Sequence, residues 1–327
     1  MNSIRRLLLL AALLPTLPAL AAPDVADIVL KPVKVSAHVY YFQGDAGMAS
    51  SANQGFMSNA GFVVTPKGVV VYDALATPAL GAAMLRAIRQ VTAAPLKVVV
   101  VGHYHADHIY GLQALRQPGV LIAGHRNGRD YLRSDAAQER LAQRRAELAP
   151  WVDEHTELVA ADRWLAFADG KPWRFELGGL HFRVIDSSGA HSPEDLLLLV
   201  EEDQALFAGD LFFTGRLPYV GNADSRRWLQ VLERMLDVRP AVVIPGHGPA
   251  SRDPRSDMLL TQRYLRYLRE QMGNAVQELL SFEEAYARTD WSAFKDYPTF
   301  SQANRLNAFG TYLLMEQESL RSGKEAK

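Results

Sequence analysis

Four side chains of types that bind metal ions lie close together after the apolar run 96–101. They are separated from that run by Gly102: His103, His105, Asp107 and His108. Side chains at this spacing cannot all point to one side of a strand or a helix. The segment is therefore predicted to be a loop after a buried strand, folded back around metal. Imidazole and carboxylate groups together suit zinc or another borderline divalent ion, and without a metal they would be costly to bury.

Three later apolar runs each lead to one further potential ligand. His191 follows the run 182–186, Asp210 closes the run 205–210, and His247 closes the run 241–247. Each run is predicted to be a strand that ends in a turn of small residues carrying the ligand. Taken alone, His191 or His247 could equally be an ordinary loop histidine. Taken together, the three residues would complete the ligand set that the first cluster begins.

The order and turn contexts of these residues resemble the ligand set of the metallo-β-lactamase superfamily. The resemblance covers about residues 37–250, and all five motifs of the superfamily can be located there. It implies two metal sites, the first held by His103, His105 and His191. The second would be held by Asp107, His108 and His247, and Asp210 would bridge the two ions.

Asp73, at the end of the apolar run 69–73, matches the first motif of the superfamily. There this carboxylate usually orients the ligand loop, as metal-bound histidines require. Two departures concern the pocket wall and leave the ligand set intact. Ala74 and Leu75 follow Asp73 where the family commonly has glycine, and residues 109–111 replace the common x-Gly-Gly with Ile-Tyr-Gly.

The resemblance implies hydrolysis without a nucleophile from the protein. Two divalent ions roughly 3.5–4 Å apart can share a water and lower its pKa towards neutrality. Two zinc ions per chain are expected, with iron or manganese as alternatives. Asp107, besides binding metal, is the predicted catalytic residue that orients the hydroxide or carries a proton. The chain has no cysteine, and Ser192 beside His191 lies in no nucleophile-elbow sequence.

Residues 1–21 have the pattern of a secretory signal peptide. Arg5 and Arg6 precede the apolar stretch 7–20, and residues 19–21 form a small-x-small cleavage site. The stretch is too short to span a bilayer, so no stable membrane span is expected after cleavage. A periplasmic or secreted location follows, reached by the general secretory or the twin-arginine route. The absence of cysteine fits an oxidising compartment.

The composition and charge of the chain indicate which kinds of molecule it binds. The 327 residues are 48% hydrophobic, which is enough to bury a large core, and the formal net charge is −1 at pH 7. No basic stripe of the kind that binds nucleic acid stands out. We therefore expect a small-molecule substrate and no nucleic-acid partner.

The hydrophobic pattern alone predicts a mixed α/β chain. The resemblance implies an α/β fold of four layers, an αββα sandwich, over residues 22–255. Helices are predicted over 78–91, where a proline stands near the start, and over 226–236. Residues 256–327 are predicted to form a helical C-terminal extension, either beside the active-site mouth or at a dimer surface. Runs bounded by turn signals predict strands over residues 38–43, 61–65, 68–72, 96–101, 120–123, 173–177, 180–185, 196–201, 205–207 and 241–244.

Two segments and three residues are candidates for shaping the pocket. Residues 44–59 lie between two predicted strands and form either a lid over the metals or a surface loop. Residues 126–151 are charged and predicted to be helical. The candidate substrate contacts, each equally readable as structural, follow the bridging position: Arg216, Tyr219 and Asn222.

The substrate is the least determined feature. The superfamily includes β-lactamases, hydroxyacylglutathione hydrolases, lactonases, sulfatases, phosphodiesterases and iron-dependent sulfur oxygenases. Its β-lactamases usually have Cys or Ser where Asp210 stands, often with a nearby Lys, whereas here the nearest cation is Arg216. The whole chain is similar to exported metallo-hydrolases associated with quinoprotein and sulfur-oxidation systems. We therefore predict an exported hydrolase of thioester, lactone or ester bonds that uses hydroxide held by two zinc ions.

Three alternatives to that function stay open. The first is a class B-like β-lactamase. The second is an oxygenase with one iron held by His103, His191 and Asp210. The third is a non-catalytic metal-binding accessory protein, although the complete ligand set argues against it because inactive homologues usually lose ligands.

Overall fold

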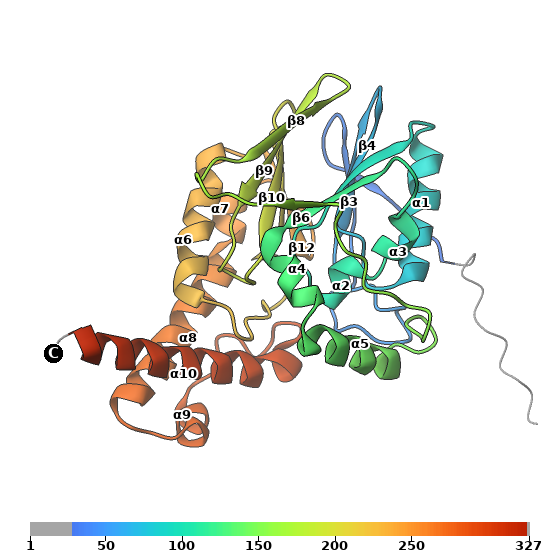
Figure 1. Ribbon diagram of the computed structural model, residues 1–327. Coiled ribbons are helices and arrows are strands. Elements are labelled where there is room, and N and C mark those ends of the chain that lie inside the picture. Colours follow the sequence, from blue (N-terminus) through green and yellow to red (C-terminus); the bar gives the residue numbers. More distant parts are fainter. Residues whose placement is uncertain (1–27, 326–327) are drawn as a thin grey trace, which may run out of the picture.

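The structure is a computed structural model that describes residues 28–325. The predicted signal peptide, residues 1–21, lies outside the described residues. In the described part, two β-sheets pack face to face, and helices cover the outer face of each sheet (Figure 1). No helix of this part is long and apolar enough to cross a membrane.

The first sheet has seven strands in sequential order. The strands β1 to β4 pair antiparallel, whereas β4 to β7 pair parallel. The central strands β3 and β4 are almost wholly buried because both faces of the sheet are covered. The strands are β1 (Val33–Lys34), β2 (Val39–Phe42), β3 (Ala60–Thr65), β4 (Gly68–Tyr72), β5 (Leu96–Val100), β6 (Leu121–His125) and β7 (Arg163–Leu165).

The second sheet has five strands in the order β12-β11-β10-β9-β8. Its neighbours pair antiparallel except for β11 and β12, which run parallel because α6 (Ser225–Met235) and the 3-10 helix η2 (Leu236–Val238) connect them. The strands are β8 (Trp173–Leu177), β9 (Leu180–Asp186), β10 (Leu196–Val200), β11 (Ala205–Phe213) and β12 (Val242–His247).

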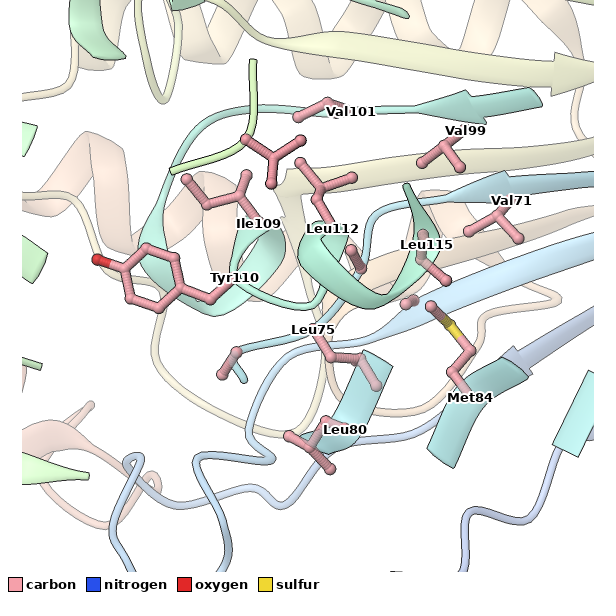
Figure 2. Close-up of a cluster of buried hydrophobic side chains, with 14 of the residues drawn as sticks. Val71, Leu75, Leu80, Met84, Val99, Val101, Ile109, Tyr110, Leu112 and Leu115 are labelled. Carbon is pink, nitrogen blue, oxygen red and sulfur yellow. The ribbon is translucent and has the colours of Figure 1, made fainter. Parts of the chain in front are cut away.

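Three buried cores separate the four layers. One fills the space between the first sheet and the helices α1 (Pro78–Val91), α3 (Leu112–Leu115) and α5 (Asp135–Glu147), where Leu80, Met84 and Leu112 pack on Val71 and Val99 (Figure 2). A second core lies between the sheets, where Tyr72 stacks on Phe207 with ring centroids 5.2 Å apart. A third lies between the second sheet and its helices. The predicted αββα sandwich is confirmed.

Local signals in the sequence explain where α1 begins. The Thr77 hydroxyl accepts a hydrogen bond from the Leu80 amide at 3.1 Å, and Pro78 stands in the first turn, where no amide hydrogen is needed. Apolar residues then recur at helical spacing and face the first sheet. The observed bounds are those predicted from the sequence.

The C-terminal part is helical, as predicted. It consists of α7 (Pro254–Asp257), α8 (Leu259–Gln277), α9 (Phe282–Arg288) and α10 (Phe300–Glu325). Buried residues of α8 and α10 share one core with Trp228 of α6 and the strands β11 and β12. The extension therefore covers the second sheet, and α10 crosses one end of the sandwich (Figure 1).

Three predicted elements differ from those observed. The strand expected over residues 205–207, with Asp210 in the turn that ends the run, continues to Phe213, so Asp210 lies within β11. The strand expected over residues 241–244 continues to His247, which therefore lies in β12 and not in a turn after it. Gly209 adopts φ +52, a backbone region that glycine enters freely, and the pairing with β12 shifts register there. The charged segment 126–151 contains two helices, α4 (Arg126–Leu132) and α5, because Ser134 begins a new helix by capping it.

Candidate metal centre

The first ligand cluster spans a loop and one helical turn. His103 and His105 lie in the loop after β5, whereas Asp107 and His108 belong to α2 (Ala106–Ile109). The backbone of Gly102 precedes them and donates to Oδ1 of Asp73 at 2.6 Å. A Cβ on Gly102 would lie 2.3 Å from the Tyr72 hydroxyl, so only glycine fits there.

Asp73 orients this cluster from the end of β4. Its backbone has φ +60, a strained conformation for a residue other than glycine. In this conformation Oδ2 lies 2.8 Å from Nδ1 of His108, while Oδ1 accepts the Gly102 amide. The contact turns Nε2 of His108 away from Asp73 and towards the centre, which is the role that the family resemblance implies for Asp73.

The other three ligand-type residues reach the centre from the second sheet. His191 lies in the turn after β9, Asp210 lies in β11 after the irregularity at Gly209, and His247 ends β12. Parallel β11 and β12 bring the last two side by side. A Cβ on Gly246 would lie 2.0 Å from Oδ1 of Asp210, so glycine is required for this approach.

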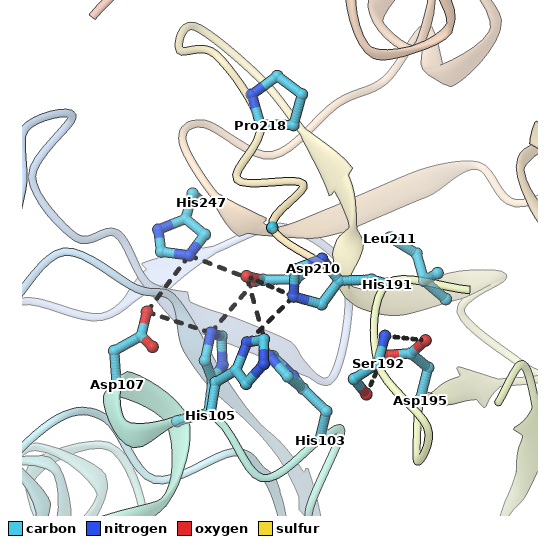
Figure 3. Close-up of polar contacts among 12 residues, drawn as sticks. His103, His105, Asp107, His191, Ser192, Asp195, Asp210, Leu211, Pro218 and His247 are labelled. Atoms are coloured by element: carbon cyan, nitrogen blue, oxygen red, sulfur yellow. Dashed lines mark hydrogen bonds and ion pairs between the residues drawn. The ribbon is translucent and has the colours of Figure 1, made fainter. Parts of the chain in front are cut away.

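The seven predicted ligand residues converge in two groups around Asp210. Figure 3 labels all of them except His108. Oδ2 of Asp210 lies 3.5 Å from Nε2 of His191 and 3.8 Å from Nε2 of His103. His105 joins this group, with Nδ1 3.1 Å from Nε2 of His191.

The second group surrounds the other oxygen of the same carboxylate. Oδ1 of Asp210 lies 3.1 Å from Nε2 of His108 and 3.3 Å from Nε2 of His247. Asp107 belongs here, with Oδ2 3.4 Å from Nε2 of His247. One carboxylate thus presents one oxygen to each group.

The donor atoms fit two divalent cations. Nε2 of His103, Nε2 of His108 and Oδ1 of Asp210 are buried and have no hydrogen-bond partner among the described residues. Polar atoms of this kind are costly to bury unless something binds them. They point at one another across the two groups, as the ligands of a dinuclear centre would.

The charge states also suit metal binding. Burial lowers the pKa of His103 well below its usual value and lowers that of His191 to about 3, which keeps both imidazoles neutral. Burial alone would raise the pKa of Asp210, but His247 and His108 outweigh it and hold that pKa well below its usual value. Burial opposes the charged form of His108, yet Asp210, Asp107 and Asp73 together raise its pKa, so a metal ion there would replace a proton.

The segment 44–59 holds the second group from one side. The Met57 carbonyl accepts from Nδ1 of His247 at 2.7 Å, and the Ser58 hydroxyl donates to the Asp107 carbonyl. Asn59 donates to the carbonyls of Pro245 and Gly248, both at 2.8 Å. This side chain therefore fixes the turn that carries His247. Sequence reasoning missed the contacts of these three residues, and no motif marks them.

The three predicted substrate contacts are placed differently from one another. Arg216 is buried (3% exposed), with Nη1 3.3 Å from Nδ1 of His247 and bonded to the Gly47 carbonyl at 3.1 Å. It therefore holds the segment 44–59 through Gly47 and lies beside a ligand. Tyr219 is half-buried and Asn222 is exposed. No hydrogen bond or ion pair among residues 28–325 joins either of these two to the ligand groups.

The loop that carries these residues is held by the C-terminal extension. Oδ1 of Asn307, in α10, accepts from the amides of Val220 and Gly221 at 2.7 and 3.2 Å. Its Nδ2 donates to the Pro218 carbonyl at 2.9 Å. Leu217 donates to the Pro298 carbonyl at 3.1 Å. The sequence carries no signal that would have identified Asn307.

Ser192 does not form a nucleophile with His191. Its hydroxyl donates to Oδ1 of Asp195 at 2.6 Å, and its amide donates to Oδ2 of the same carboxylate. Nε2 of His191 faces Asp210 and His105 instead. Ser192 and Asp195 therefore shape the turn that presents His191.

Comparisons with known proteins agree on the family. A family model of the metallo-β-lactamase superfamily matches residues 53–247. The metallo-β-lactamase IND-1 of Chryseobacterium indologenes is 23% identical over 234 residues, which are 69% of this chain and 85% of that protein.

Solved structures share the fold. The sec-alkylsulfatase Pisa1 from Pseudomonas sp. superposes with a TM-score of 0.68 at 16% identity, over 86% of this chain, although the chain spans only 50% of that protein. The metallo-β-lactamase from Pontibacter korlensis gives a TM-score of 0.56 at 21% identity, over 72% of this chain and 99% of that one. The metallo-β-lactamase FIM-1 from Pseudomonas aeruginosa, in a mono-zinc form, gives a TM-score of 0.54 at 19% identity. The match covers 73% of this chain and 96% of that one.

The match to the alkylsulfatase covers 86% of this chain, which is more than the 255 residues that precede the C-terminal extension. The shared structure therefore extends into the C-terminal helices. At these identities, shared structure shows the fold alone. The family model, by contrast, matches more than half of the chain. The chain therefore belongs to the metallo-β-lactamase superfamily.

Proposed function

We propose that the protein is a hydrolase that holds two zinc ions and acts on an ester-like bond, such as a thioester, lactone or ester. His103, His105 and His191 would bind one ion, and Asp107, His108 and His247 the other. The observation that carries the proposal is the Asp210 carboxylate, whose two oxygens face the two groups separately.

The residues of the chain divide the work of such a reaction. When bound, two divalent cations lower the pKa of water and withdraw electrons from a carbonyl oxygen. Asp73 fixes the direction of His108, and Met57 fixes that of His247. The Asp107 side chain is 11% exposed, which is the access it needs to take a proton from the attacking water and release it to solvent.

The hydrolysis of β-lactams and that of sulfate esters are two related activities to test beside the hydrolysis of ester-like bonds. The relative IND-1 is a β-lactamase, but Asp210 stands where such enzymes usually carry Cys or Ser. The nearby cation, Arg216, is buried and donates to the Gly47 carbonyl. Sulfate esters are a second candidate. The likeness to an alkylsulfatase extends into the C-terminal helices, which hold the loop 217–221 beside the centre.

Export from the cytoplasm is part of the proposal and rests on the sequence of residues 1–21. Fractionation of cells that produce the full chain tests it, combined with the mass of the mature protein. Mature protein that begins near residue 22 in the periplasmic or secreted fraction is expected. Full-length protein in the cytoplasm would contradict export without bearing on the metal centre.

The test of the reaction joins metal analysis to a substrate panel. Elemental analysis of the purified protein should give about two zinc ions per chain. The panel should contain a thioester, a lactone, an aryl ester, an alkyl sulfate, nitrocefin and a phosphodiester. Turnover of a thioester, lactone or ester, lost in Asp210→Ala, supports the proposal. About one iron per chain with oxygen uptake and no hydrolysis would favour the oxygenase, and metal without turnover would favour the accessory protein.

A further inference from the structure

The histidines of the metal centre are not all supported in the same way. Nδ1 of His108 contacts Asp73, and Nδ1 of His247 donates to the Met57 carbonyl at 2.7 Å. Nδ1 of His191, by contrast, is buried and has no hydrogen-bond partner in the part of the chain that the structure describes. Metal-bound histidines almost always donate their second ring N–H to a carboxylate, a carbonyl or a water. Another contact must therefore fix the direction of the His191 ring.

Two aromatic side chains pack around His191. The Trp228 ring, from α6, meets the imidazole edge to face, with ring centroids 5.0 Å apart and planes at 77°. The Phe213 ring, at the end of β11, lies 6.3 Å from the same imidazole and 6.2 Å from the Trp228 ring. Both aromatic residues are fully buried. Because a buried core leaves little free space, the imidazole cannot rotate unless Trp228 moves.

Trp228 is itself held at the base of the centre. Its indole Nε1 donates to the Leu211 carbonyl at 2.9 Å, and Leu211 follows the bridging residue Asp210 in β11. Because the indole hydrogen is used in this bond, it is not available to His191, and the two side chains contact each other through their rings. Trp228 therefore connects the strand that carries Asp210 to the ring of His191.

Phe213 extends the aromatic contacts to the second ligand group. It pairs with His247 in the parallel register of β11 and β12, and the two rings stack with centroids 5.1 Å apart and planes at 9°. This contact exists because β11 continues beyond Asp210. His247 also has the Met57 carbonyl as a partner, so the aromatic contacts matter most for His191.

We propose that Trp228 is the positioning residue of the metal ligand His191, where its ring takes the place of the usual hydrogen-bond partner. The ring contact fixes the direction of Nε2, which lies 3.5 Å from Oδ2 of Asp210. Metal binding by the first group would therefore depend on an aromatic contact, and metal binding by the second group on hydrogen bonds to His108 and His247. The proposal concerns metal binding and does not depend on which bond the protein hydrolyses.

NMR of the zinc-loaded wild type, labelled with 15N-histidine, tests the contact without any substitution. The Nδ1 protons of His108 and His247 should give downfield signals because each is bonded to an oxygen. The Nδ1 proton of His191 should lie upfield of both and show nuclear Overhauser effects to the Trp228 ring protons. A downfield His191 signal, or no effect from Trp228, would mean that another group such as a water holds this ring, and would overturn the proposal.

Substitution measures what the contact contributes to metal binding. Trp228→Leu removes the aromatic ring and keeps an apolar side chain. In a zinc titration against a competing chelator, the affinity of one site should fall about 10- to 100-fold, as for other partners of metal-bound histidines. The histidine NMR signals should identify the weakened site as that of His191. Trp228→Phe keeps a ring beside His191 and should restore most of the lost affinity.

Phe294→Leu is the matched control. Phe294 is buried in the same core as Trp228, but its ring contacts among the described residues are with Tyr264 and Tyr267 and not with a ligand. It should lower the free energy of unfolding in urea and leave both zinc affinities unchanged. Equal zinc affinities in Trp228→Leu and Phe294→Leu would reduce Trp228 to a core residue and overturn the proposal. The NMR test on the wild type decides the matter if Trp228→Leu does not fold.

Discussion

The metal centre and the walls around it are built in different ways. Four of the seven ligand-type residues lie within the segment 103–108, and Asp73 holds them through two hydrogen bonds. The walls instead join parts of the chain that are far apart: Met57 contacts His247, and Asn307 contacts Val220 and Gly221. The chemistry is thus encoded locally, whereas access to it depends on tertiary packing.

This difference predicts that substitutions in the centre remove activity and that substitutions in the walls tune it. Asp210 contacts residues of both ligand groups, so a change there affects both metal sites. The walls are held by individual hydrogen bonds between neutral groups, each worth about 1 kcal/mol net. Four substitutions, ordered from the metal centre outward, compare the effects of changes in the centre with those of changes in the walls.

Asp210→Ala should have the largest effect. It removes one oxygen from each group at once, so both metal sites lose a ligand. We expect hydrolysis to fall below detection and bound metal to fall below one ion per chain, measured by steady-state kinetics and elemental analysis. Asp237→Ala, an exposed carboxylate in η2, is the control. Full metal content in Asp210→Ala would refute the bridging position.

Asp73→Asn should weaken the centre without removing a ligand. The Asn side chain keeps the shape of the carboxylate but loses its charge. It also replaces one of the two oxygens that contact Gly102 and His108 with an NH2 group, which cannot accept a hydrogen bond. Partners of metal-bound histidines are typically worth about 10- to 100-fold in metal affinity or activity. Zinc titration against a competing chelator measures the change. A wild-type affinity would show that His108 needs no support from Asp73.

Asn307→Ala should act on stability more than on metal binding. It leaves the buried amides of Val220 and Gly221 without their acceptor, which costs about 1–3 kcal/mol of unfolding free energy. We expect unchanged metal content and a several-fold change in kcat/KM as the loop relaxes. Gln317→Ala, exposed on the same helix, is the control for urea unfolding. Equal stability of the two variants would mean that α10 does not hold the loop.

Trp151→Phe should have the smallest effect. It removes one hydrogen bond, from the indole to the Ser51 carbonyl, and keeps an aromatic ring in place. The loss of about 1 kcal/mol should loosen the segment 44–59 and raise KM a few-fold, with kcat nearly constant. A change in metal content would show that this segment supports the ligands more than the wall.

The same contrast explains what the sequence could predict. Strands, α1 and the ligand residues follow from local patterns: apolar runs bounded by turn signals, a proline near the helix start, and ligand types after apolar runs. The prediction that Asp210 stands in a terminal turn was wrong. The left-handed conformation of Gly209 lets β11 bend and continue to Phe213, and no pattern of apolar residues reports such an irregularity.

The walls could not be predicted for a physical reason. Arg216 follows Asp210 in sequence, which makes it a candidate substrate contact. Its burial and its bond to Gly47, however, depend on packing between residues 169 positions apart. Asn307 carries no local signature, because an Asn on a helix is usually solvated. Its position follows from how α10 docks, which a single sequence does not encode locally.

The central claim is that Asp210 lies between two metal ions. A crystal structure of the zinc-loaded protein, with anomalous data collected above and below the zinc edge, tests it most directly. Two anomalous peaks are predicted, one beside His103, His105 and His191 and one beside Asp107, His108 and His247, with Asp210 touching both. A single peak, or two peaks that Asp210 does not bridge, would contradict the claim.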